Sequence, residues 1–425
     1  MLGQQILIVI AIVLLFVPRR YAVLVFLFGA LLIPRGACFL VGTLSIFPSR
    51  FLVFVGLIRM VIKSEYPLSI PVREDWWVLT FSIICFATSY FHVDPKEAFI
   101  FSGSLVIDSA GTYLLCRTWI KSWEDIITLI KGSSLLLLIL AITMTYEKIT
   151  DHNLFAYLGH LHEYSAIRDG KIRAAGPFSH SILGGTMGAI YLPWVAAIWR
   201  DNKRIAIAML VCIVMIVYAS TSSGPILTFL AGMFALFLWK YRANIRLIKR
   251  GIICMLIMLD LVMKDRVWFL LARIDLTGSS TGWHRAKLIS SAIEHINEWW
   301  LAGTDFTRHW MPTGVSWSPD HSDITNYYIK MGVIGGLPLM ISFIMILKYS
   351  FKHIGQTYNK LGSHIPGRVE YQLWCLGSTL FAHCVTLIGV GYFDQSIVSL
   401  YSLVGIIAAG CICLQKEKTT TEASS

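Results

Sequence analysis

Residues 264–326 read KDRVWFLLARIDLTGSSTGWHRAKLISSAIEHINEWWLAGTDFTRHWMPTGVSWSPDHSDITN, the longest stretch of the chain that aliphatic residues do not dominate. Arginines, histidines, acids and tryptophans gather here, whereas the sequence on both sides is strongly apolar. Of all 425 residues, 56% are hydrophobic and 14% are charged, and the mean hydropathy is +0.65. A soluble protein of this length needs far more polar surface, so the composition predicts a polytopic membrane protein with one long polar connection.

Working outward from this stretch, the remaining sequence divides into apolar runs of the length that a membrane-spanning helix needs, which is about 20 residues. We therefore expect an all-α polytopic integral membrane protein that forms a single domain, residues 1–425, with about 12–13 transmembrane helices. The polar end of the chain, residues 415–425, is predicted to be a disordered cytoplasmic tail. The thirteen runs are 3–17, 21–44, 50–62, 76–92, 97–117, 124–145, 178–199, 204–220, 223–240, 247–263, 325–348, 371–390 and 395–414.

Lysines and arginines cluster in four connections, and the excess of basic residues in short loops assigns these connections to the cytoplasm. Counting spans from them places residues 146–177 and 264–326 on the opposite, outer face. The net charge of +11 is then explained by loops that face anionic lipid, and no nucleic-acid partner is predicted. The four basic connections are 200–204, 240–250, 348–368 and 416–418.

The nine cysteines lie almost entirely inside or at the ends of apolar runs, and none lies in 264–326. A thiol in a span behaves as a small hydrophobic group, so we expect neither a disulfide framework nor a cysteine metal site. The sequence contains no Gly-x-x-x-x-Gly-Lys-Ser/Thr loop for nucleotide phosphates. No cofactor is predicted.

Residues 283–300, WHRAKLISSAIEHINEWW, have the periodicity of one amphipathic helix that lies on the membrane surface or on the helix bundle. Arg285 falls on the apolar stripe, nearly opposite Glu294 and Glu298. An arginine on that side needs an anionic partner, and a bound phosphate fits a guanidinium well. The alternative is a side chain that extends its charged end to water.

Arg173 lies shortly before the span that we expect to begin near Pro177, since proline suits the first turn of a helix. The N-terminus of a helix itself favours anions. Arg173 and Arg285, from separate outer loops, would then meet on one face of the bundle. An interfacial anchor for lipid headgroups is the alternative role for Arg173.

His321 follows in the sequence SPDHSD, where Ser322 or Asp323 is suited to cap the next span. His321 would then lie one turn before that helix, at the outer interface. A neutral imidazole can take a proton from a sugar hydroxyl near pH 7, with Asp320 or Asp323 orienting the ring. A purely structural histidine is the alternative.

Together these motifs resemble the bacterial O-antigen ligase and polymerase family, which includes exopolysaccharide polymerases. The resemblance covers roughly residues 170–345 and rests on the order of its motifs. Arg-x-x-Gly-Pro opens one span at Arg173, and Ser220-Thr221-Ser222-Ser223-Gly224 opens another. A long outer loop with Arg285 comes next, and then His321 precedes the sequence YYIKMGVIGG of residues 327–336.

The resemblance implies a membrane glycosyltransferase of lipopolysaccharide or exopolysaccharide biosynthesis in the bacterial inner membrane, with its active site facing the periplasm or the cell exterior. Arg173 and Arg285 would hold the pyrophosphate of an undecaprenyl-linked glycan, and His321 would act on the acceptor hydroxyl. The transfer would invert the anomeric centre without a metal ion. The acceptor would be a lipid-linked glycan for a polymerase or lipid A-core for a ligase. Other membrane proteins of polysaccharide assembly are expected partners.

The chain departs from the family pattern at two positions. Ser222-Ser223-Gly224 stands where the family often has Ser-Arg-Gly, and His321-Ser322 stands where it often has His-Asn. Arg273 and Arg308 are candidates for the missing positive charge. Asp394 resembles a late acidic residue of some members.

Three other patterns point to different chemistry. Asp151, His152, His160, His162 and Glu163 lie together in the first outer loop and could bind a metal, although a solvated loop is the favoured explanation. Asp108, inside a span, indicates either a transporter or flippase or a hydrogen bond to a nearby hydroxyl. Ser222 or Ser223 with His383 would suit an intramembrane serine protease.

Overall fold

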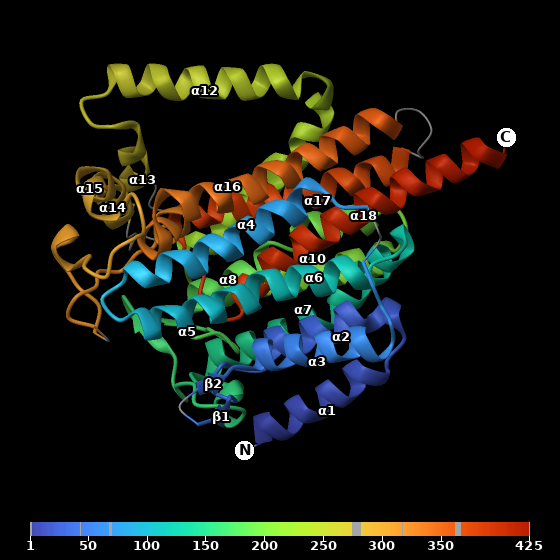
Figure 1. Ribbon diagram of the computed structural model, residues 1–425, viewed down its shortest axis with the longest axis horizontal. Helices are drawn as coiled ribbons and strands as arrows, with labels where there is room; N and C mark the ends of the chain where they lie inside the picture. Colours follow the sequence, from blue (N-terminus) through green and yellow to red (C-terminus); the bar gives the residue numbers. More distant parts are fainter. Residues whose placement is uncertain are drawn as a thin grey trace.

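The computed structural model describes residues 2–42, 44–67, 70–273, 282–316, 318–361 and 367–424, and these residues are almost entirely helical (Figure 1). Two short antiparallel hairpins are the strands of the described chain, with Phe39 opposite Ile46 in one and Ala166 opposite Arg173 in the other. The N-terminal elements are α1 (Leu2–Phe16), α2 (Arg19–Leu32), β1 (Phe39–Val41), β2 (Leu44–Ile46), α3 (Pro48–Ile62), α4 (Arg73–Thr88), η1 (Ser89–Phe91), α5 (Pro95–Val106), η2 (Ile107–Gly111), α6 (Thr112–Trp119) and α7 (Trp123–Thr150).

The central and C-terminal elements continue the helical pattern. They are η3 (Leu154–Tyr157), β3 (Ala166–Arg168), β4 (Lys171–Arg173), α8 (Ser181–Ala189), α9 (Leu192–Ile198), α10 (Lys203–Ser220), α11 (Ser223–Phe237), η4 (Leu238–Asn244), α12 (Ile245–Val262), η5 (Val267–Phe269), α13 (Leu270–Arg273), α14 (Gly282–Glu294), α15 (Ile296–Trp299), η6 (Arg308–Trp310), α16 (Tyr327–Leu361), α17 (Gly367–Gly389) and α18 (Ser396–Ser424).

The predicted all-α class is confirmed, and among the described residues seven helical stretches are long and apolar enough to cross a membrane. All thirteen predicted runs fold as helix over much of their length, but six of these helices are too short or too charged to be counted among the membrane-crossing stretches. The helices α1, α2, α3, α4 and α11 have only 14 to 16 residues. The sixth, α12, has 18 residues, and four of them, Arg246, Lys249, Arg250 and Asp260, are charged.

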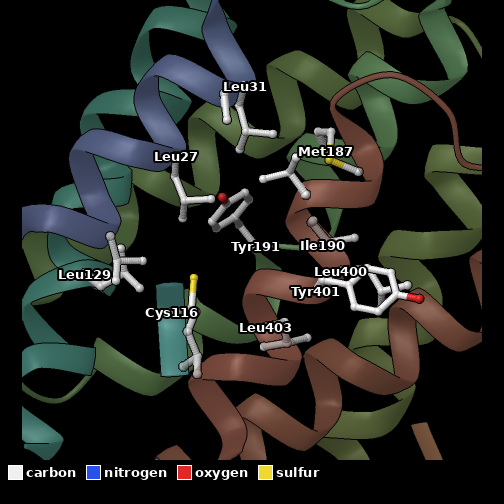
Figure 2. Packing of buried hydrophobic residues seen from close by; sticks show 14 of the residues in the cluster. Leu27, Leu31, Cys116, Leu129, Met187, Ile190, Tyr191, Leu400, Tyr401 and Leu403 are labelled. Carbon is white, nitrogen blue, oxygen red and sulfur yellow. The ribbon is translucent and has the colours of Figure 1, made fainter. Parts of the chain in front are cut away.

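The helix α18 lies at the centre of the bundle, and 94% of the residues in its apolar stretch are buried. Leu400, Tyr401 and Leu403 of α18 lie near side chains from α2, α6, α7 and α8, which are far apart in the sequence (Figure 2). In a membrane, close packing rather than removal of apolar surface from water drives such association. Gly405 allows that packing, since a Cβ atom there would lie 2.7 Å from the carbonyl oxygen of Tyr113.

The helix α18 continues beyond its apolar stretch to Ser424, and the disorder of residues 415–425 stays a prediction. A contact with α16 supports the first turn of this extension. The amide Nε2 of Gln415 donates to Thr357 Oγ1 at 2.9 Å, and Lys360 Nζ donates to Gln415 Oε1 at 3.4 Å. The polar end of the chain therefore begins as a continuation of a buried helix.

The helix α12 runs beside the bundle without packing into it (Figure 1). Every residue of α12 is exposed or half-buried, and its main neighbours are the short elements η4 and η5 at its two ends. The run 247–263 thus forms the predicted helix, but one that stands apart from the others.

The segment 300–304 docks on a break in α16. Gly335 and Gly336 interrupt that helix, and Gly336 has φ 71° and ψ −173°, a conformation that is essentially restricted to glycine. The loop satisfies the backbone groups that the break leaves free. Thr304 N donates to Val333 O at 2.9 Å, and Leu337 N donates to Trp300 O at 2.8 Å.

The predicted single helix 283–300 is in fact two helices, α14 and α15, separated at His295. His295 has φ −99° and ψ 22°, outside the helical region. The break turns part of the predicted apolar stripe outward. Leu288, Ala292 and Trp299 are buried against α16, whereas Ile293 and Trp300 are about half exposed.

Candidate functional site

Arg173 is positioned by the hairpin β3–β4, which the sequence analysis did not predict. Arg168 and Lys171 flank the two-residue turn Asp169-Gly170, where φ is 51° and 70°. Positive φ at both central residues is the requirement of the tight hairpin turn that Asp-Gly favours. The sequence IRDGKIR therefore contained a hairpin signal that places Arg173 at the end of a strand.

The segment after Arg173 is held by the buried carboxylate of Glu147, at the end of α7. Its Oε1 accepts hydrogen bonds from Ala175 N at 2.9 Å and from Ser165 Oγ at 2.9 Å. Its Oε2 accepts one from Gly176 N at 2.8 Å. Pro177 consequently lies in a loop, and α8 begins at Ser181 rather than near Pro177 as predicted.

The side chain of Arg173 is only 9% exposed. Its Nη2 donates to Ser222 Oγ at 2.6 Å, while its Nε has no hydrogen-bond partner among the described residues. Burial lowers the pKa of Arg173, and Arg168 lowers it further. Arginine nevertheless stays charged in proteins. The structure therefore holds a partly unsatisfied cation next to the hydroxyl of Ser222.

Arg285 lies in the first turn of α14 and packs on the end of α17. A Cβ atom at Gly389 would lie 3.2 Å from both Cδ and Nε of Arg285, so the absence of a side chain there makes room for the guanidinium. Burial lowers the pKa of Arg285, and the carboxylate of Asp323 opposes this shift. Its Nε also has no partner in the described part of the chain.

His180 and Asp323 connect the two arginines. Although His180 is exposed at the surface, loss of solvation lowers its pKa, Arg173 lowers it further, and Asp323 raises it. Packing places the two arginines at the same end of the bundle. A Cβ atom at Gly224, two residues after the Ser222 that Arg173 contacts, would lie 3.3 Å from Val390 Cγ2, and the preceding residue, Gly389, packs against Arg285. His284 Nε2 also contacts Asp323 O at 3.1 Å. The structure thus brings Arg173, Arg285 and Asp323 together at one end of the bundle, which we call the loop end.

His321 lies in the same loop as Asp323, and a serine contacts its ring. Its Nδ1 is 2.8 Å from Ser318 Oγ, and the orienting role of Asp320 or Asp323 stays a prediction. The cap of α16 is Asn326, whose Oδ1 accepts hydrogen bonds from the amides of residues 328 and 329. Ser322 and Asp323 are therefore not the cap, and His321 lies six residues before the helix rather than one turn.

The other predicted supporting residues are spread over the loop end. Arg308 donates from Nη1 to Met311 O at 2.8 Å and from Nη2 to Pro312 O at 3.2 Å, so its charge is used inside its own loop. Arg273 is exposed at the end of α13, next to residues 274–281, which lie outside the described chain. Ser223 is the half-buried first residue of α11. Asp320 is exposed, and its carbonyl oxygen accepts from Arg308 N at 2.9 Å.

Asp394 joins this site to a cavity of about 160 Å³. Its Oδ1 is 3.0 Å from Arg35 Nη1, and its Oδ2 accepts a hydrogen bond from Ser179, the residue before His180. The cavity is also lined by Arg50 and Lys330. Arg35 and Arg50 follow prolines in the segments that interrupt the early apolar runs, which is the signal that could have identified them.

Asp108 lines the same cavity, inside the π-helical turn η2. It accepts a hydrogen bond from Ser49 Oγ at 2.9 Å and forms an ion pair with Arg50 at 3.0 Å. Both of the roles considered for Asp108 therefore stay open. It has a serine partner, and it is a charged group beside a cavity.

A second, more open groove lies on the other side of Ser222, between α10 and α11. It measures about 700 Å³. Its walls are mainly apolar, with Lys148, Lys171 and Ser222 at one end. The apolar residues are Ile172, Val214, Val217, Ile226 and Phe229. An apolar groove that ends in basic and hydroxyl groups matches a lipid with an anionic headgroup.

The remaining patterns are not assembled as sites. In the first outer loop, His152 Nδ1 lies 3.6 Å from Glu163 Oε1, but no group of three metal-ligating side chains gathers there among the described residues. His383 is buried and its Nδ1 lies 2.8 Å from Tyr392 OH, whereas Ser222 Oγ accepts a hydrogen bond from Arg173. These separate contacts of His383 and Ser222 do not favour the protease.

No protein-family model matches the chain, and no curated protein sequence matches it significantly.

Proposed function

We propose that this protein is a membrane glycosyltransferase that moves a glycan from an undecaprenyl-pyrophosphate donor to a hydroxyl of an acceptor glycan. It would act as an O-antigen or exopolysaccharide polymerase or as a ligase. The observation that carries the proposal is the groove between α10 and α11, which leads from apolar walls to Ser222 and hence to the buried Arg173. A polyprenyl chain fits the apolar part, and a pyrophosphate fits the basic end.

In this proposal the arginines stabilise the leaving group. The charge that develops on the pyrophosphate during transfer is neutralised by Arg173 and Arg285, in a site where burial strengthens electrostatic interactions. Their Nε atoms, which lack partners within the described chain, provide donors for phosphate oxygens. The arginines would thus fill the role that a divalent ion has in other transferases.

The acceptor would approach from the side of His321. An imidazole within hydrogen-bond reach of the acceptor hydroxyl positions that group and takes its proton as the oxygen attacks the anomeric carbon. Attack opposite the leaving pyrophosphate inverts the configuration. The cavity that contains Arg35, Lys330 and Asp394 is the adjacent space for the acceptor sugars.

The test uses purified protein in lipid vesicles with an undecaprenyl-pyrophosphate glycan and an acceptor glycan. We expect a new glycosidic bond, detected by mass spectrometry, that disappears in Arg173→Ala, Arg285→Ala and His321→Ala. Matched controls are Arg204→Ala, at a cytoplasmic connection, and His162→Ala, an exposed histidine of the first outer loop. Loss of one stabilising donor costs roughly 100- to 1000-fold in rate. Equal activity in all five variants would refute the assignment.

A transporter or flippase is the second candidate, because Asp108 and Arg50 place an ion pair beside a cavity within the membrane-spanning region. A transporter would move the lipid-linked glycan across the vesicle membrane and make no new bond. Measuring translocation and bond formation in the same vesicles therefore separates the two functions.

A further inference from the structure

His295, Glu298 and His309 bring three metal-ligating side chains together in the large outer loop. His295 stands at the break between α14 and α15, Glu298 lies in α15, and His309 lies in η6. Their ligand atoms all lie within 4.8 Å of one another, the one such group found in the described part of the chain. The sequence analysis predicted no metal site, although the spacing His-x-x-Glu with a later His was its signal.

The carboxylate oxygen Oε1 of Glu298 lies between the two imidazoles. It is 2.8 Å from His295 Nδ1 and 3.1 Å from His309 Nε2. A zinc ion with bonds of about 2.0–2.1 Å in tetrahedral geometry separates its ligand atoms by about 3.3 Å. The two distances that are present need to grow by only a few tenths of an ångström to admit such an ion.

The second carboxylate oxygen is held in place by a tryptophan. Trp310 Nε1 donates to Glu298 Oε2 at 3.0 Å, and His309 Nε2 lies 2.9 Å from the same oxygen, so the carboxylate is fixed with Oε1 between the two histidines. The ring of His295 also stacks on Trp310, with 5.9 Å between centroids and an interplanar angle of 8°. Partners that orient metal ligands in this way are a regular feature of metal sites.

We propose that His295, Glu298 and His309 bind a divalent transition-metal ion of the zinc type. Two imidazoles and one carboxylate suit such an ion, whereas calcium and magnesium prefer a shell of oxygen atoms. Glu298 and His309 are exposed, so water completes the coordination. The ion joins α15 to η6 and so fixes the fold of the loop between them, which docks on the break in α16.

The proposal does not depend on glycosyl transfer, so its test measures binding. Purified full-length protein without a histidine tag is treated with a chelator, incubated with Zn²⁺ and passed through a gel-filtration column, and zinc that co-elutes is quantified. We expect about one Zn²⁺ per chain. Co²⁺ in place of Zn²⁺ should give the visible absorption bands of a low-coordinate site.

Glu298→Gln and His309→Gln should abolish retention of zinc, and His162→Gln, an exposed histidine elsewhere, should not. Trp310→Phe keeps all three ligands and should weaken zinc binding by roughly 10- to 100-fold. The elution volume reports whether each variant is folded. If His309→Gln protein is not folded, zinc retention by Glu298→Gln protein alone tests the site. Wild-type protein that retains no zinc, or Glu298→Gln protein that retains as much as wild type, would show that these residues form only a hydrogen-bonded cluster.

Discussion

Removing the carboxylate of Glu147 should loosen the segment that places Arg173. In Glu147→Gln, Oε1 can still accept from Ala175 N and Ser165 Oγ, but an amide nitrogen replaces Oε2 and faces the amide of Gly176 at 2.8 Å. A hydrogen bond to a charged group contributes about 1.5–3 kcal/mol, so this variant should lose up to about that much free energy of unfolding.

Glu147→Ala should cost more than Glu147→Gln, because it leaves two backbone amides without an acceptor at about 1–3 kcal/mol each. Glu147 is only 1% exposed, so little water is available to replace the carboxylate. The expected total is about 2–6 kcal/mol, and the order of stability is wild type, then Glu147→Gln, then Glu147→Ala.

The assay is unfolding by SDS in mixed micelles, followed by circular dichroism. Glu163→Gln is the matched control, because Glu163 is an exposed acid of the same loop, and its Oε1 lies 3.6 Å from His152 Nδ1. We expect the control to unfold like wild type, since exposed ion pairs contribute about 0–1 kcal/mol. Unfolding of Glu147→Ala at the same SDS fraction as Glu163→Gln would refute the reasoning.

Three further outcomes are expected at the loop end and its support. Gly389→Ala places a Cβ atom 3.2 Å from the side chain of Arg285. If Arg285 acts in the proposed glycosyl transfer, this variant should lower the transfer rate several-fold while the SDS unfolding curve stays unchanged. An unchanged transfer rate would argue against a role for Arg285. Gly336→Ala should destabilise the fold by at least about 1–3 kcal/mol, because the φ of Gly336 is +71°. The control is Gly355→Ala in the same helix. A Cβ atom at Gly355 has no neighbour within 4 Å, so this variant should be neutral in the same unfolding assay. His180 caps α8 through Nδ1, and its pKa is lowered from 6.5 by desolvation and by Arg173. As the pH falls, the unfolded chain therefore takes up the proton before the folded protein does. The free energy of unfolding should decrease as the pH drops below 6.5. His180→Asn keeps a cap that does not titrate and should lose part of this pH dependence, and identical pH profiles for the two proteins would contradict the assignment.

Hydropathy predicted the helical class because the period and length of apolar runs are local properties of the sequence. The break at His295 was not predictable in this way, since residues 283–300 have an unbroken helical pattern. Next to the break, Trp299 and Trp300 contact α16, whose residues lie farther along the sequence. Local propensity gives way to tertiary packing at such a point.

The candidate site shows the same division. Arg173 and Arg285 could be selected from sequence because a charged residue beside an apolar run is conspicuous. Their common neighbours could not, since Asp323 reaches both His180 and Arg285 only after three separate segments have met. Arg35 and Lys330 were overlooked for a related reason. Only the proline before Arg35 sets it apart in the sequence, and the cavity that gives both residues a role is made by α3, α5, α16 and the segment before α18 together.

The separation of α12 from the bundle has a consequence for how this protein can change over evolutionary time. A core helix such as α18 accepts few substitutions, because each side chain must remain compatible with several neighbours. The side chains of α12 have few neighbours, and every one of them is at least partly exposed. We therefore expect α12 to diverge faster than the rest of the bundle among homologous chains, keeping its apolar character and its basic beginning while the identity of individual residues drifts.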